Sequence, residues 1–166
     1  MKKMILVLVA LGLLSSSAFA SMKDSIYVGG GLGLMAVPDY GDAGIGLALR
    51  GGIDLDDVMP NLGAQVEIQK SIIDPDYGNW DTNILTLAAY ATYNIEIPSS
   101  DITVRPKFGF IFPNLGDDNS VNSRNYGFSS GFDVTYPIQD NLKVYGGYIN
   151  LGEMVNTYSV GAEFHF

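Results

Sequence analysis

The sequence contains no cysteine, one histidine and one tryptophan in its 166 residues. Without cysteine the chain has neither a disulfide framework nor thiolate chemistry. Basic residues are also scarce, because nine Lys and Arg stand against 18 Asp and Glu, which gives a formal net charge of -9. Nucleic-acid binding is driven by cationic side chains, so we expect no nucleic-acid partner.

Long apolar runs are absent except at the N-terminus. Lys2 and Lys3 precede the apolar stretch Met4–Leu14, and small residues at Ala18 and Ala20 form a cleavage site. This order is typical of a secretory signal peptide. The stretch is too short for a membrane-spanning helix, which needs about 20 apolar residues.

We therefore predict a cleaved secretory signal peptide at 1–20 and one mature domain at 21–166. Removal of the signal takes away two lysines and no acids, so the net charge changes from -9 to -11. The predicted mature length suits a single domain.

After the signal, apolar and polar residues alternate in eight segments. A period of two is typical of β-strands. Each segment has about 9–12 residues, the length that a tilted strand needs to cross a bilayer. The predicted strands are 25–35, 44–54, 62–71, 83–94, 102–112, 125–136, 142–150 and 156–166.

The two faces of these strands differ in a way that favours a membrane barrel. One face is apolar or aromatic, and the other carries Gly, Ser, Thr, Gln and nearly all the in-strand charge. A soluble β-sandwich would leave charges freely on its outer face. In lipid, the sheet must close so that every backbone group is paired. We predict an all-β fold, an eight-stranded antiparallel up-and-down transmembrane β-barrel.

The connections alternate in length. The segments 55–61, 95–101 and 137–141 are rich in turn residues, and we expect them in the periplasm. The segments 36–43, 72–82, 113–124 and 151–155 would form the outer loops, most of them longer.

These features resemble the small outer-membrane β-barrel proteins, the porin-like and OmpA-type transmembrane barrels. The matching parts are the signal at 1–20, the glycine-rich first strand from Tyr27 to Gly33, and a last strand that ends on alternating aromatics. The resemblance implies a monomer in the outer membrane of a Gram-negative bacterium. Its implied partners are membrane lipids, lipopolysaccharide and the barrel assembly machinery, which would read an assembly signal at Tyr158, Phe164 and Phe166. No peptidoglycan-binding domain follows in the sequence, so we expect no tethering to the cell wall.

Eight strands enclose a lumen just wide enough for side chains, and charge held there is costly unless it is paired or hydrated. Counting along the hairpins predicts Lys143 nearly opposite Glu163, Asp133 near Arg105, and Glu67 diagonal to Arg50. The favoured interpretation is a polar plug, and the alternative is a water-lined conduit for small ions. The predicted lumen charges are Arg50, Glu67, Arg105, Lys107, Asp133, Lys143 and Glu163.

Glycines on the inward face leave space in the lumen. We expect Gly29, Gly31, Gly33 and Gly46 to make room for Arg50 and Tyr90, or to leave a slot for water.

We predict no catalytic residue, cofactor or metal. His165 shares a face with Glu163 and Ser159, the residue types of a hydrolase, but Ser159 and His165 are six strand residues, roughly 20 Å, apart, beyond hydrogen-bond reach. Acids in the connections have the oxygens that calcium prefers, but they match no EF-hand and are explained by the turn chemistry of Asp. These acids include Asp54, Asp56, Asp57, Asp74, Asp76 and Asp81.

The sequence predicts location better than activity. The primary hypothesis is an integral outer-membrane barrel with a structural role or passive permeation of small solutes and ions. The alternative is surface adhesion or recognition through the outer loops, and a weaker one is a lipid-modifying enzyme. The loop candidates are Asp76, Tyr77, Trp80, Asp117 and Asp118.

Overall fold

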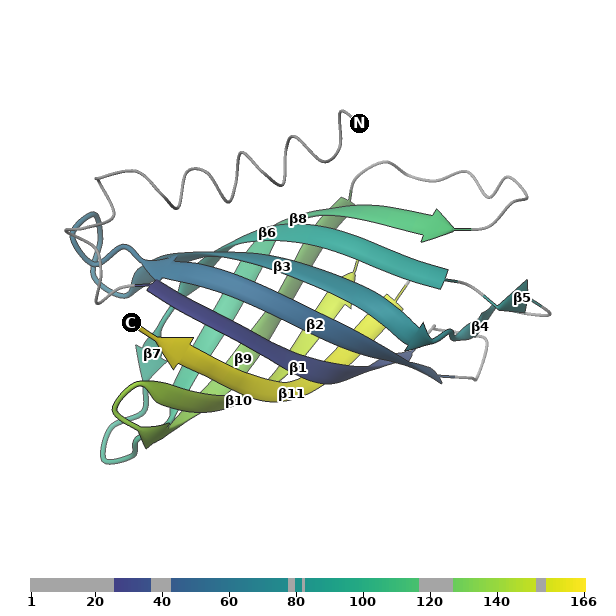
Figure 1. Cartoon of the computed structure of the whole chain (residues 1–166). Coiled ribbons are helices and arrows are strands. Elements are labelled where there is room, and N and C mark those ends of the chain that lie inside the picture. Colours follow the sequence, from purple (N-terminus) through teal and green to yellow (C-terminus); the bar gives the residue numbers. More distant parts are fainter. Residues whose placement is uncertain (1–25, 37–42, 78–79, 82, 117–126, 152–154) are drawn as a thin grey trace.

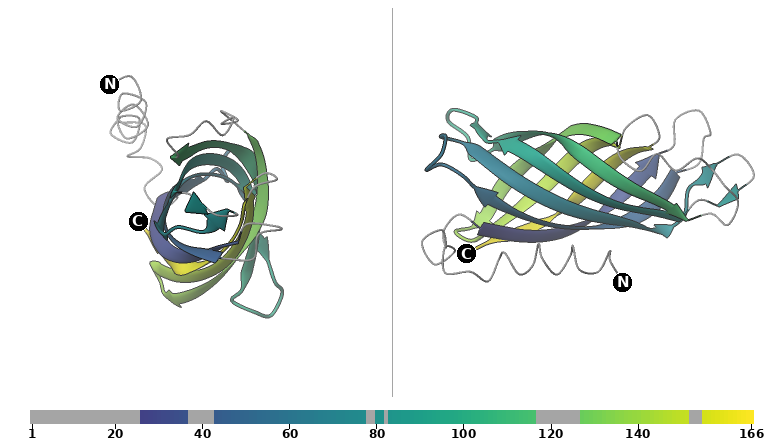
Figure 2. Two further views of the ribbon diagram at one scale, coloured as in Figure 1. Left: turned by 90° about the vertical axis from the view of Figure 1, so that its right-hand side faces the viewer. Right: turned by 90° about the horizontal axis from the view of Figure 1, so that it is seen from above.

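The computed structural model describes residues 26–36, 43–77, 80–81, 83–116, 127–151 and 155–166. They form a closed antiparallel β-barrel, seen from the side and along its axis in Figures 1 and 2. Neighbouring strands of the chain pair with each other, and the first pairs with the last to close the wall, which confirms the predicted fold class. The eight long strands are β1 (Ile26–Ala36), β2 (Ala43–Asp54), β3 (Leu62–Ile73), β6 (Asn83–Tyr93), β8 (Thr103–Gly116), β9 (Gly127–Gln139), β10 (Leu142–Leu151) and β11 (Val155–His165).

Within the described residues, no helix is long and apolar enough to cross a membrane. The two ends of the barrel differ. We call the end where the chain finishes at Phe166 the terminal end, and the opposite end, where β1, β3, β8 and β10 finish, the loop end.

Several strands run further than the predicted boundaries. Strand β8 continues to Gly116 because β6 begins at Asn83 and offers it a partner there. Strand β9 continues to Gln139, so that only Asp140 and Asn141 separate it from β10. The predicted connections at 113–124 and 137–141 therefore begin too early.

Two predicted connections contain short strands. The segment 72–82 holds a small hairpin, β4 (Asp76–Tyr77) paired with β5 (Trp80–Asp81), beyond the barrel wall at the loop end. The segment 95–101 begins with β7 (Ile95–Glu96), which pairs with β8. Such two-residue pairings are too short for an alternation pattern to reveal.

Strand β7 continues the line of β6. The pairing with β8 stops after Thr92 opposite Lys107 and resumes with Ile95 opposite Val104, three residues further on each strand and without a shift of register. Pro106 lies in the interruption and has no backbone N–H to donate to the ladder. A proline in β8 thus accounts for the break between β6 and β7.

Alternation along the strands places apolar side chains outside and polar or small ones inside. The outward side chains are exposed, for example Leu49 at 56%, Phe110 at 59% and Val160 at 67%. The exposed apolar surface of a soluble monomer is rarely so extensive. The wall is therefore apolar outside, as a bilayer requires.

The lumen contains two layers of side chains. Charged and polar residues fill the terminal half, and the loop half holds an apolar cluster together with the buried hydroxyl side chains of Ser71, Thr86, Ser129 and Thr157. The cluster consists of Met35, Ile84, Ala88, Tyr90, Ile149, Ile111, Leu151 and Val155.

Inward glycines make space for specific side chains rather than for a water slot. A Cβ at Gly31 would lie 2.5 Å from the Tyr145 hydroxyl, and a Cβ at Gly29 would lie 3.0 Å from Cγ of Glu163. A Cβ at Gly46 would meet Met35. The expectation for Tyr90 is therefore wrong: Gly31 accommodates Tyr145, a ring on another strand that hairpin counting does not bring to this position.

Candidate functional site

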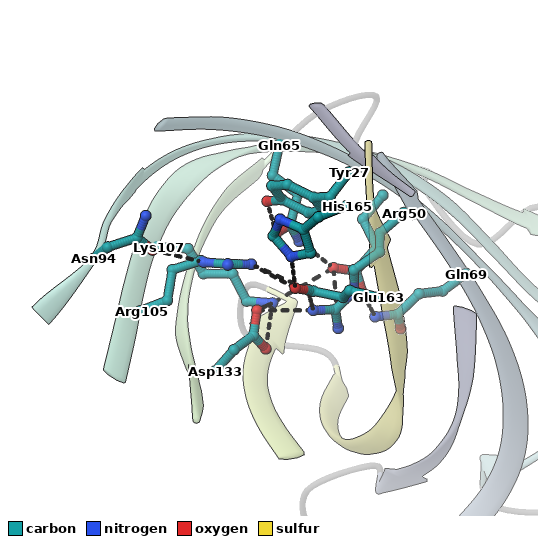
Figure 3. Close-up of polar contacts among 11 residues, drawn as sticks. Tyr27, Arg50, Gln65, Gln69, Asn94, Arg105, Lys107, Asp133, Glu163 and His165 are labelled. Atoms are coloured by element: carbon teal, nitrogen blue, oxygen red, sulfur yellow. Dashed lines mark hydrogen bonds and ion pairs between the residues drawn. The ribbon is translucent and has the colours of Figure 1, made fainter. Parts of the chain in front are cut away.

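The polar half of the lumen holds three cations and three carboxylates, so its formal charges cancel. They come from five strands, and none of the six side chains is more than 2% exposed. Figure 3 shows how they converge across the barrel. The six residues are Arg50, Arg105, Lys107, Glu67, Asp133 and Glu163.

Glu163 on β11 joins two arginines from opposite sides of the lumen. Its Oε1 accepts hydrogen bonds from Arg50 Nη1 at 3.1 Å and from Arg105 Nη1 at 3.0 Å. Arg105 also donates through Nε to the side-chain oxygen of Asn94 at 2.9 Å. The last strand is thereby fixed to β2 and β8.

Asp133 on β9 has a similar role. Both of its oxygens lie 2.9 Å from Lys107 Nζ, and Oδ2 accepts from Arg50 Nη1 at 2.9 Å. Arg50 therefore bonds to two carboxylates at once through a single nitrogen. Charge-assisted bonds of this kind are the stronger ones in proteins.

Glu67 on β3 completes the network. Lys107 Nζ lies 3.5 Å from its Oε2, and Gln65 and Gln69 donate amide hydrogen bonds to its two oxygens at 2.9 and 2.5 Å. Tyr27 in turn donates its hydroxyl to Gln65 at 2.9 Å. Buried carboxylates need such partners, because an unpaired charge is costly to desolvate.

Each cation also faces a tyrosine ring. The Arg50 guanidinium lies 3.4 Å from the centroid of Tyr145, that of Arg105 lies 4.7 Å from Tyr27, and Lys107 Nζ lies 5.5 Å from Tyr90. Such contacts are attractive and gain strength when they are desolvated. Alternation along their strands puts the three tyrosines on inward faces, but it does not reveal that they pair with the cations.

Two of the three predicted charge pairs face each other in the ladders but bond to other partners. Lys143 is opposite Glu163 and Arg105 is opposite Asp133 in the ladders. Glu163 bonds instead to Arg50 and Arg105 on more distant strands. Asp133 bonds to Lys107, two residues further along the neighbouring strand, and to Arg50 across the lumen. Glu67 is directly opposite Arg50 rather than diagonal to it, with Nη2 and Oε2 4.0 Å apart. Hairpin counting considers adjacent strands only, and long side chains in a narrow barrel reach across it.

Lys143 lies outside the buried network, at the terminal mouth of the lumen. It is half-buried and lines a pocket of about 470 Å³ with Thr135 and the turn 97–102. The register explains this position, because Lys143 is on the same face of β10 as Tyr145 but two residues nearer to the terminal end.

His165 caps the terminal side of the network. Its ring stacks on Tyr27 at 5.2 Å between centroids, and Nε2 lies 3.7 Å from Glu163 Oε2. Ser159 lies in the ladder between Gly33 and Gly147. Among the described residues, no group of three or more His, Cys, Asp or Glu side chains is placed to hold a metal ion.

The other sequence candidates belong to the loops and to the last strand. Asp76, Tyr77 and Trp80 are carried by the β4–β5 hairpin, where Tyr77 pairs with Trp80. Asp117 and Asp118 lie outside the described residues. The residues of the predicted assembly signal, Tyr158, Phe164 and Phe166, point outward and are 54%, 40% and 52% exposed.

Comparison with known proteins decides the family. The model of the outer membrane protein beta-barrel domain matches residues 6–166. The chain belongs to this family. The match confirms the resemblance that the sequence suggested and its location in the outer membrane. A search of curated sequences finds no significant match.

Several solved structures share the fold of this outer-membrane barrel. Neisserial surface protein A is 15% identical with a TM-score of 0.62, over 85% of this chain and 97% of its own. OprG of Pseudomonas aeruginosa is 12% identical with a TM-score of 0.56, over 87% and 98%. Ail of Yersinia pestis, solved with the heparin analogue sucrose octasulfate, is 13% identical with a TM-score of 0.56, over 86% and 97%. At these identities, the likeness concerns the fold alone.

Proposed function

We propose that this protein is a closed, structural outer-membrane barrel whose lumen does not conduct ions. The observation that carries the proposal is the stacking of two different layers inside one narrow lumen. An ion passing through would have to disrupt a charge-balanced network that includes Glu163 and then cross an apolar cluster around Ile149. Apolar constrictions oppose the passage of ions because they exclude water.

The test is single-channel conductance in a planar bilayer, with protein extracted from outer membranes. We expect no conductance steps from wild-type protein whose insertion is shown independently by protease protection. Reproducible steps whose ion selectivity changes in Arg105→Glu would overturn the proposal and establish permeation through the lumen.

A variant with a weakened apolar layer separates the contributions of the two layers to closure. Ile84, Ile149 and Leu151 are each at most 3% exposed inside the loop half of the lumen. Replacing all three with serine should allow water into this half, while the ionic layer still blocks conduction. Stable conductance of this variant would show that the ionic layer alone does not close the lumen. The proposal that both layers block ions would then be wrong.

A second candidate function is recognition at the cell surface. The β4–β5 hairpin projects beyond the wall at the loop end and combines Asp76 and Asp81 with Tyr77 and Trp80 (Figure 1). Rigid scaffolds often carry their binding residues on such loops. Because this hairpin is acidic, its partner would be cationic or neutral rather than a sulfated sugar.

Replacing 76–81 with a Gly-Ser turn tests this candidate. Loss of adhesion of bacteria to host cells, with the amount of barrel in the outer membrane unchanged, would favour recognition. Unchanged adhesion would remove this candidate and leave the structural role.

We also propose that residues 1–20 are removed during export and that the barrel is a monomer assembled by the barrel assembly machinery. The family membership supports both parts. N-terminal sequencing of the protein from outer membranes should begin at Ser21, and a retained Met1 would contradict cleavage.

A further inference from the structure

Among the described long strands, one charged side chain away from the strand ends lies on the lipid-facing side of the barrel. Lys70 on β3 is exposed, and its neighbours Gln69 and Ser71 point into the lumen. All the other charged residues of the described long strands belong to the inward face or to a strand end, as their burial and register show. Lys70 is thus an isolated cation on the face that contacts lipid.

The surroundings of Lys70 are apolar. Ile68 and Ile72 lie on either side of it along β3, exposed by 37% and 62%. Its register partners are Leu47 on β2 and Leu85 on β6, also exposed, by 43% and 37%. A lysine among lipid-facing aliphatic side chains is destabilising to a degree that depends on its depth in the bilayer.

The depth of Lys70 allows its amine to reach the headgroups. Lys70 is three positions from Ile73 at the loop end of β3, which is roughly 10 Å at about 3.3 Å per residue. The distance along the membrane normal is shorter because strands are tilted. A lysine lays its aliphatic stem along the apolar surface and extends its ammonium group to the interface. Asn83, exposed on the adjoining strand at the loop end, adds a polar amide on the same face.

No partner among the described residues accounts for this charge. Lys70 takes part in none of the ion pairs among the described residues. Glu67, the acid on the same strand, is buried on the lumen side, and Asp74, just after the strand, bonds to Ser71 and Asn83. A second copy of the chain would offer no carboxylate from the outward faces of its described strands. An ionisable residue within a membrane span indicates a functional site with a partner of opposite charge.

We propose that Lys70 binds a phosphate group of lipid A, the membrane anchor of lipopolysaccharide, in the outer leaflet around the loop end. The chain as a whole carries a net charge of -9 and therefore repels anionic lipid in general. Attraction must then come from a local cation, and Lys70 is the one that the described lipid-facing surface provides. The proposal rests on the membrane location and not on whether the lumen conducts.

The experiment titrates lipid A into protein that has been isolated from outer membranes and washed free of lipid. Binding is followed by native mass spectrometry in detergent. Lys70→Leu should weaken binding about fivefold, the attraction expected of one lysine near an anionic surface, and Lys70→Arg should retain it. Leucine suits a lipid-facing position, so Lys70→Leu should fold, which circular dichroism checks.

Lys143→Leu is the matched control, since it removes the same charge from the lumen mouth. Equal weakening by both leucine variants would mean that only net charge matters and would overturn the proposal, as would unchanged binding in Lys70→Leu. Phosphatidylglycerol and inorganic phosphate distinguish the source of the phosphate. If phosphatidylglycerol binding depends on Lys70 as strongly as lipid A binding does, the assignment to lipid A is wrong.

Discussion

Arg50 and Glu163 meet above Gly29, with Nη1 of the arginine 3.1 Å from Oε1 of the glutamate. Gly29 on β1 is the register partner of both residues, and β2 and β11 lie on either side of it. The ion pair therefore bridges the seam at which the first and last strands close the barrel. It requires a residue without a side chain at this point of β1.

Gly29→Ala should destabilise the barrel. Its added Cβ would lie 2.6 Å from the carbonyl oxygen of Ala162 and 3.0 Å from Cγ of Glu163. Overpacking of this kind costs about 1–3 kcal/mol, measured as the free energy of unfolding in urea from lipid vesicles. Gly146→Ala is the control, because nothing lies within 4 Å of a Cβ built there. Equal stability of the two variants would show that the seam tolerates a side chain.

Glu163→Gln keeps the shape of the side chain and removes its charge. Arg50 and Arg105 would then share the remaining carboxylates, leaving an excess positive charge in the lumen. Breaking a buried ion pair at one partner costs about 3–5 kcal/mol, again measured by urea unfolding in vesicles. Glu96→Gln, at an exposed position of β7, should change stability little.

A double-mutant cycle separates the pair from its surroundings. Because Arg105→Gln restores the charge balance that Glu163→Gln disturbs, the double variant should lose less stability than the sum of the single variants. Strict additivity would contradict the direct contact at 3.0 Å.

Alternation in the sequence was sufficient to predict the wall. In a membrane barrel, each residue faces either lipid or lumen, so a period of two reports the environment directly. The sequence predicted that Arg50 and Glu67 are inward neighbours, because one short turn joins their strands. The prediction was diagonal, whereas the two residues are directly opposite each other.

The contacts across the lumen could not be predicted in this way. Arg50 and Glu163 are 113 residues apart, and their contact depends on the closure of the barrel and on its width. The apolar layer was also missed, because Met35 and Ile84 are apolar residues on the inward face, where the alternation predicts polar ones. The outward cation of the described strands, Lys70, could have been found as a charge that breaks the apolar face of its strand.

Ile149→Ala tests the packing of the apolar layer. Ile149 is fully buried beside Met35 and Ile84 in the loop half of the lumen. Truncating a buried isoleucine costs about 2–5 kcal/mol through lost contacts and a cavity. The same change in Ile45, which is outward and 39% exposed, should cost less because lipid can fill the space. Urea unfolding of both variants in one vesicle composition makes the comparison, and equal losses would indicate a loosely packed lumen.

Phe166→Ala tests the predicted assembly signal separately from stability. Phe164 and Phe166 form an edge-to-face pair on the outside of the terminal end, with ring centroids 5.2 Å apart. If the assembly machinery reads this pair, the variant should accumulate less folded barrel in the outer membrane, although it refolds into vesicles almost as well as wild type. Phe128→Ala, at an outward position of β9 that is 59% exposed, removes an equivalent ring far from the C-terminus and should leave the yield in cells unchanged. If both variants lose the same amount of folded barrel in cells and in vesicles, Phe166 acts through lipid contact alone. A recognition signal would instead lower the yield only in cells, where the assembly machinery is present.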